Sequence, residues 1–397
     1  MATDGSTEAE TSAQEAERPA FLELFFDLVY VFALLSLADK LVNRMTWAVA
    51  GQVLVLLLAF ALIWVLTAWT GSTADLSRPM AQPQVIWAMA GSLLLAATVP
   101  DAYGSRGLLF AITYVLIHIG SILYNLSTGG PGPELMDSRR WVLLWEGVAG
   151  IGWIVGGLLT GTARGVLWAV AVGIEYTGVV LGWPGLPLRG PHPPRRRRLA
   201  GERLAERYRR FVIIALGTSI FVAGSSFSEP RTQRIDQAWS LVVVFVITVL
   251  MWRIYIYRAG EMMTVAVARS DDPSRLSQFT AVAHLIMVAG IVGTAAAGQF
   301  VIEHPFEETP APWAASILGG SALFLIGRGM LDYIVFRRVS RSRPVGLVLL
   351  GAAAPVVQLL SMIETALLVM VILCLIAVAN LVMNRAHPRS PTPPVLG

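Results

Sequence analysis

The stretch FLELFFDLVYVFALL, residues 21–35, combines a membrane-like composition with two acids. Most of its residues are apolar enough to lie in lipid, yet Glu23 and Asp27 occur within it, four residues apart. Residues at this spacing share one face of a helix, and Tyr30 lies on the same face. A carboxylate that faces lipid costs about 2.5 kcal/mol or more. We therefore expect this face to turn toward other helices or a wet cavity.

The composition of the whole chain extends this expectation. Of the 397 residues, 55% are hydrophobic and only 14% are charged, whereas an ordinary soluble protein has about 25% charged residues. The apolar residues come in long unbroken runs, and a helix needs roughly 20 of them to cross a bilayer. We therefore predict an all-α fold, a polytopic membrane helix bundle. Because Cys374 is the single cysteine, the chain has no intrachain disulfide and no cysteine metal cluster.

About twelve apolar segments are candidates for membrane spans. They cover residues 22–41, 47–69, 84–101, 107–126, 141–160, 164–183, 209–228, 237–258, 277–298, 313–335, 345–361 and 363–384. The last two are nearly continuous, and QLLSMIET around Ser361 supplies the break between them. Eleven spans is therefore the alternative.

The placement of the arginines predicts the orientation of the chain. They are concentrated at the two ends and in every second connection between spans. Because cytoplasmic connections carry the excess of Lys and Arg, we expect both termini in the cytoplasm and the protein in the plasma membrane. Residues 1–20 are predicted to form a disordered acidic tail without a secretory signal, and residues 386–397 a disordered proline-rich tail.

The longest connection between spans, residues 185–208, is rich in proline and arginine and divides the chain into halves of six spans, residues 21–184 and 209–385. We expect Arg195–Arg198 to contact anionic lipid headgroups, each contributing about 1 kcal/mol, rather than nucleic acid. The halves open similarly, with ELFFDLVYVFALL and ERYRRFVIIALGTS. This similarity suggests two parallel six-helix repeats.

Polar residues at the start of the seventh span could be partners for the acids of the first. They are Glu206, Arg207, Arg210 and Thr218. We predict that Glu23 or Asp27 approaches one of the two arginines. This arrangement has two interpretations: a structural clamp at the cytoplasmic edge of the membrane, or an ion or proton site.

The same two stretches resemble the bacterial low temperature requirement A (LtrA) family. RPAFLELFFDLVYVFAL is similar to a family first span of the form E-L-F-F-D-L-V-F-V-F-A, and LAERYRRFVIIALGTSI is similar to H-x-x-E-R-x-x-x-F-x-I-I-x-L-G-E. The chain departs from the second pattern at Arg203, in place of histidine, and at Thr218, in place of glutamate. The resemblance implies an integral membrane protein, linked by name to growth in the cold and without an established molecular activity.

Further charged residues lie inside the predicted spans. Glu146 and Glu175 are flanked by glycine, and buried acids in membranes are functional by default, although either could simply be hydrogen-bonded. Arg328 and Asp332 are spaced i, i+4 and are predicted to neutralise one another. Glu364, at the break between the last two spans, is predicted to be a cap or interface residue.

Histidines and glycines carry weaker signals. His118 and His284 lie in spans, but no H-x-x-x-H or H-E-x-x-H spacing occurs, so we predict no metal site, no cofactor and no enzymatic activity. Gly152 and Gly156 form a G-x-x-x-G pattern, which predicts tight helix packing.

Taken together, the sequence favours binding or transport of an ion or small solute through a charged site between two helical halves, in stress or cold adaptation. The predicted site residues are Glu23, Asp27, Tyr30, Glu146, Glu175, Glu206, Arg207, Arg210 and Thr218. Two alternatives stay open: a non-catalytic membrane scaffold or stress protein, and a lipid-modifying membrane enzyme. The oligomeric state is not predicted.

Overall fold

The computed structural model describes residues 4–73, 82–128, 133–180, 194–228, 235–270 and 273–386. Within these residues the chain forms thirteen α-helices and no strands, apart from one isolated bridge between Glu308 and Ser361. Ten helices are long and apolar enough to cross a membrane, and two further apolar helical segments, Val142–Leu158 and Ser342–Ala353, are shorter. The predicted all-α bundle is confirmed.

The chain divides into two compact units. The first contains Met1–Ser36 and Leu54–Pro193, and the second contains Leu37–Val53 and Pro194–Gly397. The predicted boundaries of the two halves and the internal repeat stay predictions.

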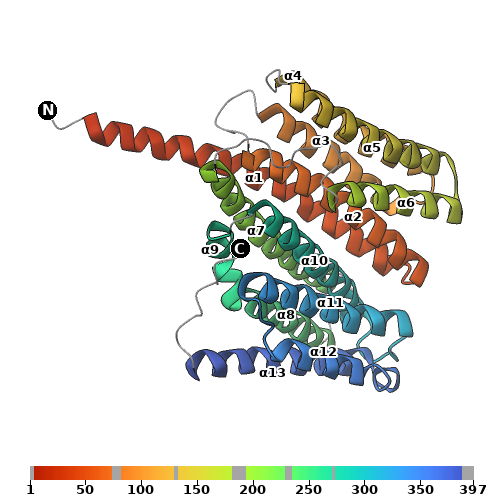
Figure 1. Cartoon of the computed structure of the whole chain (residues 1–397). Coiled ribbons are helices and arrows are strands. Elements are labelled where there is room, and N and C mark those ends of the chain that lie inside the picture. Colours follow the sequence, from red (N-terminus) through yellow and green to blue (C-terminus); the bar gives the residue numbers. More distant parts are fainter. Residues whose placement is uncertain are drawn as a thin grey trace. The chain divides into compact units, whose positions relative to one another are not determined.

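The first unit contains helices from the N-terminal half of the chain, labelled in Figure 1. They are α1 (Asp4–Asn43, up to Ser36), α2 (Trp47–Thr73, from Leu54), α3 (Gln82–Thr98), the short helix η2 (Val99–Asp101), α4 (Gly107–Thr128), α5 (Pro133–Leu158) and α6 (Gly161–Val180). Helices α3 to α6 pack in chain order, each against the next. This order places α4, α5 and α6 side by side.

Helix α1 begins at Asp4, inside the segment predicted to be a disordered tail. Its residues 4–20 are rich in alanine and glutamate, which favour helix, and a helix that already exists in the apolar segment extends without a new nucleation step. Within the apolar segment one face is buried and carries Phe26, Asp27 and Tyr30. Leu24 and Leu28, on the other side, are exposed. The helix therefore buries Asp27 and exposes leucine side chains on the opposite face.

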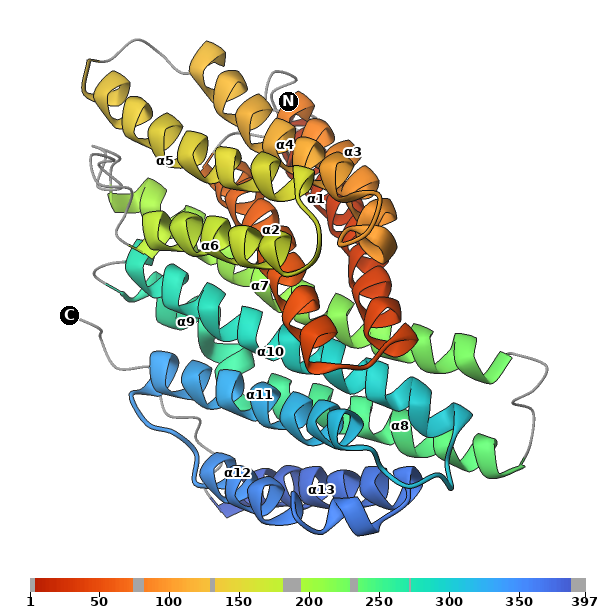
Figure 2. The same ribbon diagram turned by 90° about the vertical axis from the view of Figure 1, so that its right-hand side faces the viewer.

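The second unit contains helices from the C-terminal half. They are α7 (Pro194–Ser228), α8 (Ile235–Tyr255), η3 (Ile256–Gly260), α9 (Glu261–Ala268), α10 (Pro273–Glu303), α11 (Ala311–Phe336), α12 (Ser342–Ala353), η4 (Val357–Leu359) and α13 (Met362–Ala386). Helix α10 is central because it packs against α7, α8, α11 and α13. Figure 2 shows α10 running beside α11.

Helix α7 includes part of the predicted linker. It begins at Pro194, so the part of the linker from residue 194 to residue 208, including Arg195–Arg198, is helical. Proline is favoured at the first position of a helix because its missing N–H would have no partner there. Residues 185–193 of the linker and residues 387–397 of the C-terminal tail lie outside the described residues.

The last two spans are separated as predicted, but the first of them is shorter than expected. Helix α12 has 12 residues and is therefore about 18 Å long, less than the roughly 30 Å of hydrocarbon in a bilayer. It ends at Ala353, just before Pro355, which cannot donate a backbone hydrogen bond. Glu364 accepts hydrogen bonds from the backbone N–H and the hydroxyl of Ser361, both at 2.8 Å, so it caps the start of α13 as predicted.

Candidate functional site

Three ionisable side chains of the first unit meet in the interior of α4, α5 and α6. They are His118, Glu146 and Glu175, and their exposed fractions are 7%, 7% and 1%. One potential ligand atom from each lies within 4.8 Å of the other two. The structure thus brings together two of the predicted site residues, Glu146 and Glu175, with a histidine that was not among them. We call these three residues the acid–histidine cluster.

Close packing of α5 against α6 brings Glu146 and Glu175 near one another. A Cβ atom on Gly152 would lie 3.2 Å from the Cβ of Ala171, and one on Gly156 would lie 2.6 Å from Cδ1 of Trp168. Any side chain at either position would push the helices apart. The G-x-x-x-G pattern therefore does what the sequence predicts, and it does so beside the cluster.

Neutral donors hold the carboxylate of Glu175. The hydroxyl of Tyr114 donates to Oε2 at 2.8 Å, and Nε1 of Trp153 donates to Oε1 at 3.2 Å. Nε1 of Trp168 in turn donates to the backbone carbonyl of Trp153 at 3.0 Å. Each oxygen of Glu175 thus has a fixed partner, but neither partner carries a positive charge. These two hydrogen bonds therefore fix the orientation of the carboxylate, but they do not neutralise its negative charge.

Aromatic rings surround the cluster and keep its dielectric constant low. The rings of Tyr114 and Trp153 are 4.4 Å apart, and those of Tyr114 and His118 are 4.6 Å apart. Phe110 and Trp168 extend the same wall, with their ring centres 5.3 Å apart. Electrostatic interactions are stronger in such surroundings than in water.

The imidazole of His118 has one engaged nitrogen and one available nitrogen. Its Nδ1 lies 3.2 Å from Oε2 of Glu146. In the neutral ring this contact assigns the proton to Nδ1, so Nε2 keeps its lone pair. Nε2 is buried and has no hydrogen-bond partner among the described residues. A buried nitrogen that keeps its lone pair can accept a proton or coordinate a metal ion.

The chemistry of the cluster follows from its charges. Two carboxylates held close together in apolar surroundings repel one another, and a shared positive charge relieves the repulsion. A proton, a protonated imidazole or a metal cation could supply it. One nitrogen and two carboxylate ligands form a set that suits zinc or manganese. In such a site Oε2 of Glu146, which contacts Nδ1 of His118, would orient the imidazole, and the other oxygen of Glu146 would be the ligand.

The polar face of α1 also turns inward. Nε1 of Trp64 donates to Oδ1 of Asp27 at 2.9 Å, and Asp27 is completely buried. The hydroxyl of Tyr30 donates to the carbonyl of Phe60 at 3.2 Å. Glu23, one turn nearer the start of the apolar segment, is half-buried. The prediction that Asp27 faces the protein interior is confirmed.

Two of the predicted residues of α7, Thr218 and Glu206, have local contacts. Arg207 and Thr218 are buried, and Arg210 is half-buried. The hydroxyl of Thr218 donates to the carbonyl of Ala215 at 2.6 Å, and Glu206 pairs with Arg209 at 2.7 Å. All of them lie in the second unit, whereas Glu23 and Asp27 lie in the first. The pairing between these two groups stays a prediction.

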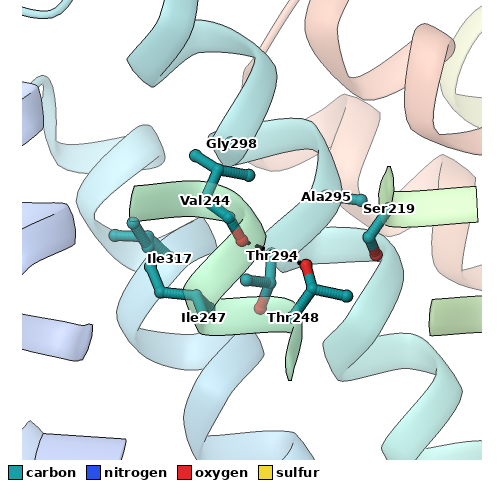
Figure 3. A pocket seen from close by; sticks show the side chains of 8 residues that line it. All are labelled: Ser219, Val244, Ile247, Thr248, Thr294, Ala295, Gly298 and Ile317. Carbon is teal, nitrogen blue, oxygen red and sulfur yellow. Dashed lines mark hydrogen bonds between the residues drawn. The ribbon is translucent and has the colours of Figure 1, made fainter. Parts of the chain in front are cut away.

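The second unit contains a small, mainly apolar cavity between α7, α8, α10 and α11, shown in Figure 3. Its volume is about 10 Å³, which is roughly the space that the centre of one water molecule requires. Hydroxyl groups of Ser219, Thr248 and Thr294 line it, together with apolar side chains such as Ile247. Its size fits a single water molecule, not an organic solute.

Comparisons with known proteins identify the family of the chain. The model of the family described as bacterial low temperature requirement A protein (LtrA) matches residues 18–380. A relative from Rhizobium meliloti (strain 1021), called uncharacterized protein RA0937, is 32% identical over 379 residues, which cover 94% of this chain and 91% of the relative. No solved structure matches the chain. The chain, a multi-pass membrane protein by its apolar helices, thus belongs to the bacterial low temperature requirement A protein (LtrA) family.

Proposed function

We propose that this protein binds a cation at the acid–histidine cluster and carries it across the membrane. The observation that carries the proposal is the buried meeting of His118, Glu146 and Glu175, with a lone pair available on Nε2 of His118. Ionisable groups inside membrane helices are expensive and usually mark an ion pathway. A purely structural cluster would be expected to have all its polar atoms paired, as buried polar atoms normally are.

The acids of α1 extend the proposed path. Asp27 is buried on the inward face of its helix, and Glu23 is half-buried one turn earlier. We propose that these acids, together with Tyr30, lie between the cluster and the cytoplasm. Arg207 and Arg210, with Glu206 and Thr218 on the same helix, lie in the second unit and stay predicted site residues there. No enzymatic step is part of this proposal.

Not every buried charge of this protein is part of the proposed cation path. Arg328 and Asp332 pair with one another at 2.5 Å, as predicted. Such self-compensated pairs fit the scaffold alternative, in which the charges only hold helices together. The acid–histidine cluster differs because the two hydrogen-bond donors to Glu175, Tyr114 and Trp153, carry no opposite charge. This difference favours cation binding over the scaffold.

The proposed transport can be tested in liposomes that contain the purified full-length protein. Flux of protons and of Zn²⁺ or Mn²⁺ would be followed with entrapped indicator dyes. We expect Glu146→Gln and Glu175→Gln to abolish flux of the transported cation and Asp27→Asn to slow it. Asp39→Asn, which changes an exposed acid of α1, is the matched control and should keep wild-type flux.

A direct binding measurement distinguishes a protein that transports the cation from one that only binds it. Equilibrium dialysis of the detergent-solubilised protein with Mn²⁺ or Zn²⁺ should show one site that is lost in Glu146→Gln. If neither flux nor binding is detected for any of these cations, or if Asp39→Asn behaves like Glu146→Gln, the proposal is wrong and the scaffold is favoured.

The proposed setting is the plasma membrane, with both termini in the cytoplasm and with Arg195–Arg198 near anionic headgroups. The support is the distribution of the arginines. In a Cys374→Ser background, a membrane-impermeant maleimide added to intact cells should label Thr162→Cys but not Arg338→Cys. The reverse pattern would contradict the orientation. A role in cold or stress adaptation is part of the same proposal and rests on the family name.

A further inference from the structure

A second buried group of charges, in the second unit, has more positive than negative charge. Arg328, Asp332 and Arg343 have exposed fractions of 0%, 4% and 1%. Asp332 pairs with Arg328 at 2.5 Å through Oδ1 and with Nε of Arg343 at 3.4 Å through Oδ2. Among the described residues these are the ion pairs of the two arginines. One carboxylate thus faces two guanidinium groups, which leaves one positive charge in excess.

The two guanidinium groups are used differently. Nε of Arg328 donates to the carbonyls of Ile254 and Tyr255, at 2.9 and 3.1 Å, and Nη2 donates to the carbonyl of Tyr257. These bonds hold the break between α8 and α9, where the backbone leaves the helical conformation. Each of the three guanidinium nitrogens of Arg328 thus has at least one partner, and the bonds have a structural role. The excess charge resides on Arg343.

Arg343 has spare hydrogen-bonding capacity. Its Nη1 donates to the hydroxyl of Ser342 at 3.1 Å and to Oδ1 of Asn380 at 3.3 Å. Its Nη2 is buried and has no hydrogen-bond partner among the described residues. A buried guanidinium group with an unpaired N–H and an uncompensated charge is strongly unfavourable unless something accepts from it.

Two further buried donor groups, on Asn380 and Tyr257, also lack hydrogen-bond partners among the described residues. Oδ1 of Asn380 accepts from the hydroxyl of Ser342, which directs Nδ2 elsewhere, and this Nδ2 has no partner among the described residues. The hydroxyl of Tyr257 also lacks one, and this phenol is subject to the charges of three arginines, Arg258, Arg343 and Arg328, and of one carboxylate, Asp332. Spare donors and excess positive charge therefore coincide between α11, α12, α13 and η3. We call Arg343, Asn380 and Tyr257 the donor cluster.

The first turn of α12 adds to this arrangement. The helix begins at Ser342, directly before Arg343, and no side chain caps its N-terminus. The N-terminus of a helix carries a partial positive charge and attracts anions. The helix end alone would not indicate a site, but it lies beside donors that are themselves buried and without partners.

We propose that the donor cluster binds an oxyanion of the phosphate type. A phosphate group supplies a negative charge and several acceptor oxygens, which match the excess charge and the spare donors of Arg343, Asn380 and Tyr257. The group can come from inorganic phosphate or from the headgroup of a phospholipid. The site goes beyond the proposed cation transport, since it lies in another unit and uses none of the acid–histidine cluster.

Binding can be measured as stabilisation of the purified full-length protein in detergent. Tm would be recorded against increasing inorganic phosphate at constant ionic strength and, in a second arm, against dioctanoyl phosphatidylglycerol with dioctanoylglycerol as the phosphate-free control. We expect a saturable rise in Tm in at least one arm, because a ligand that binds only the folded state stabilises it. A response to phosphate identifies the free anion, and a response to phosphatidylglycerol alone identifies the lipid headgroup.

Three variants locate the effect. Arg343→Gln removes one charged donor and should weaken the apparent affinity at least about tenfold. Arg338→Gln changes an exposed arginine near the same helix start and should respond like the wild type. Asn380→Asp places a carboxylate next to Arg343 in the position of the anion, so it should raise Tm without ligand and remove the response.

Three results would overturn the proposal. They are the absence of a saturable shift in both arms, an equal response in Arg343→Gln and Arg338→Gln, and a lower Tm of Asn380→Asp in phosphate-free buffer. Should Arg343→Gln fail to fold, Asn380→Asp decides alone, because the proposal requires this variant to be more stable than the wild type without ligand.

Discussion

Arg164 is expected to be the most important single side chain for the stability of the first unit. It is 3% exposed and lies at the start of α6. Its guanidinium group donates five hydrogen bonds of 2.6–3.2 Å, to the carbonyls of Ala102, Gly104, Gly156, Gly157 and Leu159. It thereby ties the end of α5 to the turn that precedes α4.

The size of the effect can be worked out from these bonds. A hydrogen bond to a charged group contributes about 1.5–3 kcal/mol, but burying the guanidinium group offsets part of the sum. Removing one partner of a buried charged arrangement typically costs about 3–5 kcal/mol. We therefore expect Arg164→Met to lose about 3–5 kcal/mol. Arg164→Lys keeps the charge but has fewer donors, so it should lose about 1–3 kcal/mol.

The partners of Arg164 are dipoles, which predicts a weak response to salt. Arg164 makes no ion pair among the described residues. Burial raises the pKa of the nearby Tyr103 phenol well above its ordinary value, so this group stays neutral at physiological pH. Buried interactions are screened little, so the loss in Arg164→Met should change little up to about 1 M salt.

The assay is thermal unfolding of the full-length protein in detergent, followed by tryptophan fluorescence. The guanidinium carbon of Arg164 lies 5.6 Å from the ring centre of Trp168, so local loosening should change the emission. Arg106→Met is the control: this exposed arginine donates one hydrogen bond, to Ala97 at 3.1 Å, and its loss should cost under about 1 kcal/mol. If Arg164→Met is no less stable than Arg106→Met, the reasoning about buried carbonyl partners is wrong.

Three further predictions concern helix packing, charge compensation and the lipid-facing surface. Gly156→Ala should lose about 1–3 kcal/mol because the new Cβ meets Trp168, whereas Gly147→Ala, with open space around it, should not be destabilised in thermal unfolding. Asp332→Asn should lose about 3–5 kcal/mol in the same assay because two buried guanidinium groups keep their charge without a carboxylate; stability equal to the wild type would contradict the assigned ion pairs. Cys374 is exposed within an apolar span, so its thiol should resist a membrane-impermeant maleimide in native membranes and react after denaturation, since this charged reagent does not enter the hydrocarbon.

The all-helical fold was predictable because the hydrophobic pattern is strong and local, but the number of spans was predicted less well: the described residues contain ten helices long and apolar enough to cross a membrane, with two shorter apolar segments. Apolar runs of about 20 residues leave helix as the conformation that pairs every backbone group in lipid. The break near Ser361 was also predictable, because a polar, cap-forming sequence interrupts the last apolar run. The short α9 and the early end of α12 were missed. The break before α9 depends on Arg328, which is 71–74 residues away from the carbonyls it holds.

The candidate site was predictable only in part, for a related reason. A buried acid in a membrane helix is visible in the sequence, and both Glu146 and Glu175 were selected on that basis. His118 lies on a different helix, and the spacing between the three residues follows no metal-binding motif. Their meeting depends on which faces of α4, α5 and α6 touch, which tight packing at Gly152 and Gly156 decides.

The number of hydrogen-bond partners distinguishes structural charges from candidate binding groups in this protein better than the depth of burial does. Arg164 and Arg328 are as buried as the proposed sites, but their donors are occupied by backbone carbonyls and, for Arg328, a carboxylate. His118 and Arg343 each keep a polar atom without a hydrogen-bond partner among the described residues. Burying such an atom costs free energy that folding alone does not recover. A ligand that completes it would recover that free energy, so these two positions, rather than the most buried charges, are where binding should be sought.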